Sequence, residues 1–281
     1  SDVLDGQSYV LQSSGAAGTP TATLGVLLDS SETSFDGSSL VISDSIDNAM
    51  LGLVIGHTDN TADYTIVGSE GVDNISVGSG ENTVTGGDGK DTINLLTAVA
   101  DMDTIIIAND DHSTTTVDVS TATTPTITAD FDVIVGWTTG TTAALKDLLD
   151  LPVTPVIPDA ATDTDGTDST GEVGAGAVVD THSISAVGLI TFKNDATPAA
   201  AVAPTTDALL GAVLDYLTNN DLGNAGTTVI MNDGSDDTYV YQQTATTKGD
   251  TGGFTLVHLD AVALTGIETT ASTTDLYAYI G

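Results

Sequence analysis

Three consecutive nine-residue units carry glycines and acidic or amide side chains at regular positions, a pattern suited to metal binding. The units are Gly68–Ser76, Val77–Thr85 and Gly86–Asn94. Each has glycines in its first positions, Asp or Asn at position six and a large apolar residue at position eight. Carboxylate and carbonyl oxygens are the ligands that Ca²⁺ prefers, and it takes about 6–8 of them at roughly 2.3–2.6 Å. The units therefore predict a calcium site, with a glycine-rich β-meander without metal as the alternative.

A tight glycine turn followed by a very short strand must position these oxygens. Glycine allows positive φ, so the backbone carbonyls of the turn can converge on one point. We expect two units to complete one coil, which stacks Asp73 on Asp91 and brings the carbonyls of their two turns together. Asn82 then lies on the opposite edge and needs a stacked partner. The candidates for this partner are Asp63, Asp101 and Asp103.

The predicted metal ligands come from two places in the chain. In the repeats they are side chains or backbone carbonyls of Gly68, Glu70, Val72, Asp73, Asn82, Gly86, Asp88, Lys90 and Asp91. In a later acidic segment they are Asp163, Asp165 and Asp168. This segment is close to the pattern of an EF-hand loop, but Ala161 stands where the first Asp should be. A solvated acidic loop is the alternative there.

The remaining candidate metal-binding residues of the sequence are not expected to hold a metal. The chain has no cysteine, which excludes disulfides and thiolate metal sites. Segment Asn232–Asp236 is interpreted as a hairpin turn. The histidines share no ligand spacing, so each is interpreted as a surface or core residue; they are His57, His112, His182 and His258.

The charge balance restricts the classes of partner. There are 40 acidic residues against 4 lysines, and the formal net charge is −36. Binding to nucleic acid needs a cationic face, so nucleic acid is excluded as a partner, and an anionic membrane surface is disfavoured for the same reason. No apolar run is long enough for a membrane span. Most of the acids are Asp, which suits turns and calcium loops; a marine or halophilic surface kept soluble by charge is the alternative.

Short runs of Thr, Val and Ile between Gly and Asp turns predict an all-β chain. We expect a short parallel β-roll flanked by β-sandwich-like domains with one or two short helices. An i, i+3, i+4 apolar stripe predicts a helix over Thr205–Leu217, and a shorter one is expected over Thr142–Leu149. The predicted organisation is an N-terminal β unit over 1–58, the calcium-binding roll with following strands over 59–151, an acidic linker loop over 152–180 and a C-terminal β-rich domain over 181–281.

The three units fit the template G-G-x-G-x-D-x-U-x, where U is a large apolar residue, and resemble the repeat-in-toxin (RTX) proteins. Among these, the chain is most similar to the calcium-dependent S-layer proteins that bacteria export by type I secretion. Ser69, Val77 and Asn82 depart from the template. The resemblance extends loosely over about 60–281, and its further segments are Ala129–Val135, Gly188–Phe192, Asp237–Tyr241 and Asp260–Gly266.

The resemblance implies Ca²⁺ as the cofactor and a secreted location, either extracellular or at the bacterial cell surface. No metalloprotease, serine-hydrolase or phosphate-loop motif occurs, so we expect no enzyme. We expect a structural subunit that self-associates into a lattice or filament, with cell-surface polysaccharide as a further candidate partner. The alternative is a noncatalytic adhesin or the C-terminal calcium and secretion portion of a larger exported enzyme. The absent N-terminal leader predicts a C-terminal export signal that includes Leu276–Ile280, which is otherwise the last strand.

Overall fold

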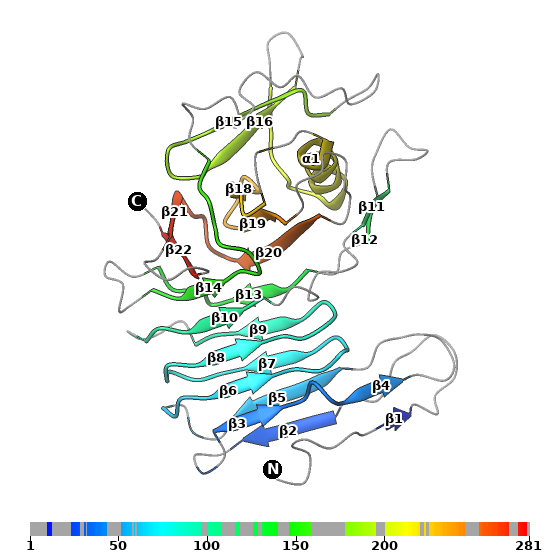
Figure 1. The fold of residues 1–281 in the computed structure, drawn as a ribbon, viewed down its shortest axis with the longest axis vertical. Coiled ribbons are helices and arrows are strands. Elements are labelled where there is room, and N and C mark those ends of the chain that lie inside the picture. The colour runs from blue at the N-terminus through cyan, green and yellow to red at the C-terminus, as the bar shows by residue number, and fades with distance from the viewer. Residues whose placement is uncertain are drawn as a thin grey trace. The chain divides into compact units, whose positions relative to one another are not determined.

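A computed structural model gives the fold in two compact units (Figure 1). One unit contains Ser1–Ser113 and Phe131–Asp150, and the other contains Thr114–Asp130 and Leu151–Gly281. The four-part division predicted from the sequence stays a prediction. The structure describes residues 10–12, 24–28, 31, 33–43, 52–57, 59, 61–96, 101–107, 116–118, 126–128, 131–139, 146–158, 178–194, 200–219, 222, 225–244, 253–269 and 275–279.

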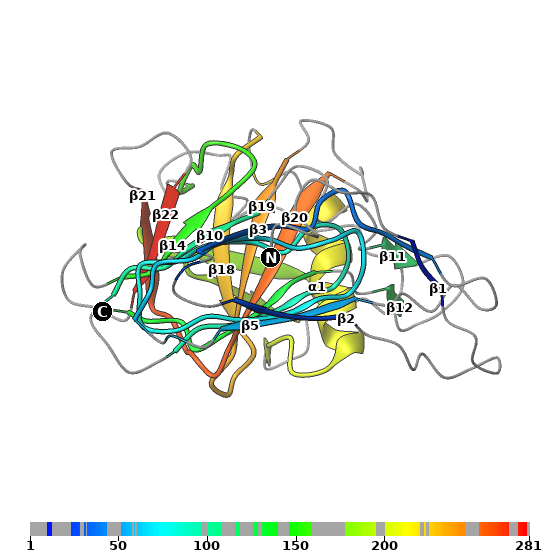
Figure 2. The same ribbon diagram turned by 90° about the horizontal axis from the view of Figure 1, so that it is seen from below.

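Two parallel sheets form a β-roll in the first unit, which confirms the predicted fold class. One sheet contains β3 (Ser34–Asp36), β6 (Thr65–Val67), β8 (Thr83–Thr85), β10 (Thr104–Ile106) and β14 (Leu148–Asp150). The other contains β2 (Leu24–Leu28), β5 (Leu53–His57), β7 (Asn74–Ser76), β9 (Thr92–Asn94) and β13 (Val133–Val135). Figure 2 shows β2 and β5 on one side of the roll and β3 and β10 on the other. A further parallel pair joins β1 (Val10–Gln12) to β4 (Val41–Ser43).

One buried apolar side chain from each strand fills the space between the two sheets. The strand register aligns Val26, Ile55, Ile75, Ile93 and Ile134 in one column. It aligns Phe35, Ile66, Val84, Ile105 and Leu149 in the facing column. Because side chains alternate along a strand, only the central residue of each three-residue strand points inward. The position-eight residues of the repeats are therefore core residues, as predicted.

Antiparallel strands and one helix form the second unit. The strand groups are β15 (Thr181–Ile184), β16 (Ile190–Lys193) and β17 (Ala201–Val202); then β18 (Thr228–Asn232), β19 (Thr238–Gln243) and β20 (Phe254–Asp260). Two further antiparallel pairs are β11 (Thr116–Asp118) with β12 (Thr126–Thr128), and β21 (Gly266–Thr269) with β22 (Asp275–Tyr279). The tail Leu276–Ile280 thus supplies most of a last strand.

The helix α1 (Asp207–Asn219) lies where the apolar stripe predicted it. Thr206 caps it, because the Thr206 hydroxyl accepts a hydrogen bond from the Leu209 N–H at 3.3 Å. The shorter helix expected over Thr142–Leu149 is wrong at its end, where Leu148–Asp150 is strand β14. Leu149 lies beside Ile105 in the core column, and this packing overrides the helical pattern. Among helices in the described part of the chain, none has the length and apolar character of a membrane span.

Candidate metal centre

Buried carboxylates are stacked along one edge of the roll, where the turns lead into β7, β9 and β13. The Asp73 N–H donates to Asp91 Oδ1 at 2.6 Å, and the Asp91 N–H donates to Asp132 Oδ1 at 2.9 Å. The Leu53 N–H donates in the same way to Asp73 Oδ1. The three Asp residues are at most 3% exposed. Each carboxylate therefore bonds the backbone of the coil before it.

A second stack follows the opposite edge, where the turns lead into β8, β10 and β14. The Tyr64 N–H donates to Asn82 Oδ1 at 3.0 Å, and the Asn82 N–H donates to Asp103 Oδ1 at 2.9 Å. The Asp103 N–H donates to Asp147 Oδ1 at 3.0 Å. All four residues are buried. The repeats thus specify two edges built by the same rule, with position six as the repeating polar residue.

The stacked partner of Asn82 is Asp103, one of the three candidates from the sequence. Asp63 is exposed and accepts the Glu81 N–H at 2.8 Å. Asp101 is buried near the same edge, and its Oδ2 has no hydrogen-bond partner among the described residues. An orphaned buried carboxylate oxygen is costly, which points to a cation here.

Sequence reasoning missed Asp132 and Asp147 as members of the stacks. A signal was present, because each stands two residues before a core residue, as in Asp132-Val-Ile134 and Asp147-Leu-Leu149. The same spacing relates Asp91 to Ile93 in the repeats. These later coils lack the glycine pattern. Successive stack members are 18 residues apart at Asp73 and Asp91, but 41 apart at Asp91 and Asp132 and 44 apart at Asp103 and Asp147. The nine-residue period therefore does not reveal them.

The glycine turns bring oxygens together at positions where no side chain fits. A Cβ on Gly68 would collide with the Gly86 carbonyl oxygen and lie 2.5 Å from Asp73 Oδ2. A Cβ on Gly86 would collide with Asp91 Oδ2 and lie 3.0 Å from Asp132 Oδ2. Carbonyl and carboxylate oxygens of successive coils thus converge on the same small spaces. Such a cradle of hard oxygens fits Ca²⁺.

Glycine is also required by the backbone of the third repeat. Gly87 and Gly89 have φ values of +105° and +108°, a region that residues with a Cβ rarely adopt. A Cβ on Gly87 would also collide with the Ser69 carbonyl oxygen of the preceding coil. The glycines of the template therefore permit both the turn and its close stacking.

The other non-glycine ligands predicted in the repeats do not have buried side chains. Glu70, Val72 and Asp88 have exposed side chains. The Val72 carbonyl oxygen faces the preceding coil, where a Cβ on Gly52 would collide with it. Lys90 Nζ lies 5.0 Å from the centroid of the Phe131 ring, a cation–π contact. The acidic candidates Asp163, Asp165 and Asp168 lie outside the described residues. The assignment of individual ligands stays a prediction.

Burial opposes the charge on these carboxyl groups. Desolvation raises the pKa of Asp73, although hydrogen bonds from Leu53 and Ser69 act in the opposite direction. Desolvation also raises the pKa of Asp103 to about 6 and that of Asp147 to about 7, with the charge of Asp101 adding to both. Carboxylates that repel one another in a buried site need a cation to remain ionised at neutral pH. The electrostatics and the donor set therefore agree on a bound divalent cation.

Comparison with known proteins identifies the repeats. Residues 67–96 match the family model of the RTX calcium-binding nonapeptide repeat (4 copies). No curated protein and no solved structure matches the chain. The repeats bind calcium, so the predicted cofactor is confirmed, and such repeats are typical of secreted proteins. The finer resemblance to S-layer proteins stays a prediction.

Proposed function

We propose that this chain is a structural, noncatalytic protein that assembles outside the cell in a calcium-dependent way, as an S-layer or surface-filament subunit. The observation that carries the proposal is the extent of the buried acidic stacks. They run beyond the repeats to Asp132 and Asp147, so buried carboxylates line both edges of the roll well past the repeats. In this proposal calcium is part of the scaffold, and the buried acids hold the architecture together.

The dependence on calcium supports a location outside the cell. Calcium sites of extracellular modules are tuned to roughly 10⁻⁴–10⁻³ M, far weaker than cytosolic sensors. A roll that needs several such ions stays unfolded at low calcium and folds where calcium is abundant, because metal binding supplies the free energy of folding. This behaviour suits a chain that crosses an export channel before it folds.

The surface of the chain supports calcium-dependent association of its copies. A formal charge of −36 with only 4 lysines and no arginine makes copies repel one another until cations bridge or screen them. Among the described residues, β2 and β3 end the two sheets of the roll. Leu27 on β2 is 69% exposed and Val54 on the adjacent β5 is 45% exposed. Terminal strands with exposed apolar residues are suited to pairing with another chain.

The second candidate is a noncatalytic adhesin or the calcium-binding and secretion portion of a larger exported enzyme. The division into two compact units favours it, because a roll and a separate antiparallel unit can serve as modules of a longer protein. The strand β22 is compatible with either candidate, since a last strand can also carry export information.

Sedimentation velocity and negative-stain microscopy at millimolar calcium and in chelator test the proposal. We expect ordered polymers with calcium and dispersed subunits after chelation. Particles that remain monomeric under both conditions, at the concentrations reached on a cell surface, would remove the assembly proposal and leave the adhesin or fragment candidate.

A further inference from the structure

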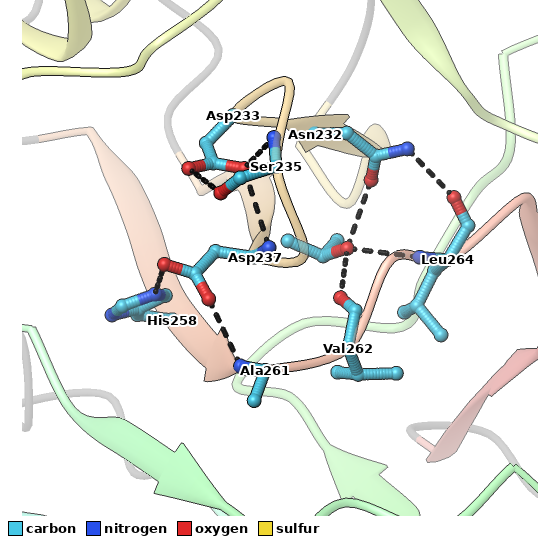
Figure 3. Close-up of polar contacts among 9 residues, drawn as sticks. Asn232, Asp233, Ser235, Asp237, His258, Ala261, Val262 and Leu264 are labelled. Atoms are coloured by element: carbon cyan, nitrogen blue, oxygen red, sulfur yellow. Dashed lines mark hydrogen bonds and ion pairs between the residues drawn. The ribbon is translucent and has the colours of Figure 1, made fainter.

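A second cluster of metal-binding side chains lies at one end of the β19–β20 hairpin in the second unit. Figure 3 shows two of its members, Asp237 and His258. Asp237 directly precedes β19, and His258 and Asp260 lie at the end of β20. One candidate ligand atom from each residue lies within 4.8 Å of the other two. We propose that Asp237, His258 and Asp260 form a site for a divalent transition-metal ion of the Zn²⁺ class. This site differs in chemistry from the calcium sites of the roll.

The donor set selects the class of metal. It combines an imidazole nitrogen with two carboxylate oxygens, whereas Ca²⁺ takes oxygen ligands. Imidazole suits Zn²⁺, Cu²⁺ and Ni²⁺. Two ligands of a tetrahedral Zn²⁺ ion at about 2.0–2.1 Å are roughly 3.3–3.4 Å apart. His258 Nε2 and Asp237 Oδ2 are 3.3 Å apart, so this pair already has the spacing of two zinc ligands.

The strand register gives an independent reason for a cation at this place. Thr238 pairs with Leu259, and Tyr239 pairs with His258. The same register continued by one step puts Asp237 opposite Asp260. Like charges directly opposite one another destabilise an antiparallel pair. A divalent ion held by both carboxylates and the imidazole removes this repulsion.

Neighbouring groups hold the proposed ligands in place. The Tyr239 ring stacks on the His258 ring, with centroids 4.7 Å apart and planes at 17°. Asp237 Oδ1 accepts the Ala261 N–H at 2.9 Å, which leaves Oδ2 directed at the imidazole (Figure 3). The Asp237 N–H in turn donates to Asp233 Oδ1 at 3.2 Å. Contacts of this kind orient metal ligands and are as characteristic of metal sites as the ligands themselves.

The exposure of the cluster suits reversible binding of an ion from solvent. The side chain of His258 is 15% exposed and that of Asp237 is 29% exposed. Three protein ligands leave a fourth tetrahedral position for water or for a group from another molecule. Because the ligands join the start of β19 to the end of β20, binding ties the two ends of the hairpin together. Metal that binds only the folded state stabilises the second unit.

The test uses the full chain saturated with Ca²⁺, so that the roll is folded throughout. ZnCl₂ is titrated by calorimetry, and Co²⁺ is added as a spectroscopic probe of coordination. We expect one zinc site per chain and a Co²⁺ absorption spectrum of the tetrahedral type. His258→Gln and Asp260→Asn should each weaken binding by at least about tenfold. Asp236→Asn is the matched control, because Asp236 is exposed in the same turn and the change removes the same charge.

Several outcomes would overturn the proposal. These are no zinc binding by the native chain, equal binding by His258→Gln and Asp236→Asn, or displacement of Zn²⁺ by excess Ca²⁺. Melting curves without zinc show whether each variant folds. If His258→Gln does not fold, nitrogen NMR of the native histidine rings decides the question. The proposal requires the His258 ring resonances to shift when zinc is added, and unchanged resonances would refute it.

Discussion

The two units of this chain bury polar groups in different ways. The roll buries carboxylates such as Asp91 and Asp147, and burial together with the charges of Asp103 and Asp101 opposes ionisation of Asp147 without a cation. In the second unit most of the buried polar side chains are neutral, with Asp215 as a buried carboxylate among them, and several bond groups of the protein itself. Thr238 Oγ1, for example, accepts the Leu264 N–H at 3.0 Å, and its single hydroxyl hydrogen is shared between two acceptors, Asn232 Oδ1 at 2.8 Å and the Val262 carbonyl at 2.7 Å. The roll therefore depends on an ion for stability, whereas the second unit depends on its own hydrogen bonds and core.

Removal of calcium should produce the largest effect and separate the two units. We expect the strand signal of the roll to be lost in chelator while the second unit keeps its melting transition. A single ion at a concentration one hundred times its dissociation constant contributes about 2.7 kcal/mol, and several ions bind the same unit. Calorimetry with and without chelator measures both transitions. Identical traces would show that the acidic stacks are stable without metal.

The loss of folding stability caused by single substitutions in the stacks should be larger for a charged residue than for a neutral one. Asp91→Ala removes a buried carboxylate that accepts the Asp73 N–H, and we expect a loss of about 2–3 kcal/mol in calcium. Asn82→Ala removes a neutral side chain that accepts the Tyr64 N–H and donates to Asp103 Oδ1, and we expect about 1–2 kcal/mol. Urea unfolding in millimolar calcium gives both values. Asp88→Ala is the control, because it removes an exposed side chain and keeps the backbone carbonyl, the part of Asp88 that can act as a ligand here, so stability should change little.

The roll without calcium should become less stable as pH rises. Burial raises the pKa of Asp103 to about 6 and of Asp147 to about 7, above the ordinary value of 3.8. The folded state thus keeps protons that the unfolded state releases, so stability is greatest below about pH 4 for these groups and falls through about pH 6–7. The strand signal of the calcium-free chain, recorded by circular dichroism from about pH 7 down to about pH 4, measures this effect, because the folded fraction of the roll should recover as the pH falls.

The variant Asp147→Asn sharpens this pH prediction. Its amide keeps an oxygen that can accept the Asp103 N–H but carries no charge. Without calcium at neutral pH, we expect it to be more stable than the native chain. Its calcium affinity should nevertheless be lower, because a charged ligand is gone. A variant less stable than the native chain without calcium would contradict the electrostatic account.

The smallest effect should come from the helix cap of the second unit. Thr206→Ala removes the hydroxyl that accepts the Leu209 N–H, at a cost of about 1 kcal/mol. We expect this loss in the second transition alone, with the same size in calcium and in chelator. A loss that changes with calcium would show that the two units are energetically coupled.

The sequence predicted the repeats well because their information is local. Position eight predicted Ile75, Val84 and Ile93 as core residues, and all three are fully buried. The apolar spacing of Leu210, Val213 and Leu217 predicted α1 in the same way. In each case one short segment contains both the residue and the period that identifies its role.

What the sequence did not predict depends on pairing between distant segments. Asp132 joins a stack 41 residues after Asp91, and no local period spans that distance. His258 was interpreted as a surface or core residue, because its neighbours Asp237 and Asp260 come together only through the hairpin register. Helix propensity at Leu148–Asp150 gave way to pairing with β10. Sheet register is set by long-range contacts, which a single sequence records only indirectly.

The hydrogen bonds of the stacks give the roll a direction. Between coils of this stack, each carboxylate accepts a hydrogen bond from an N–H of the coil before it. Asp73 accepts the Leu53 N–H, Asp91 accepts the Asp73 N–H, and Asp132 accepts the Asp91 N–H. A coil is thus completed by the one that follows it in the chain. In a structure where each repeat contacts only its neighbours, ordering can begin at any coil and spread to the next, and a later coil that is already ordered supplies the side-chain acceptors for the coil before it. Under the C-terminal export that the resemblance implies, the later coils would leave a channel first, and each coil that becomes ordered outside would hinder the return of the chain.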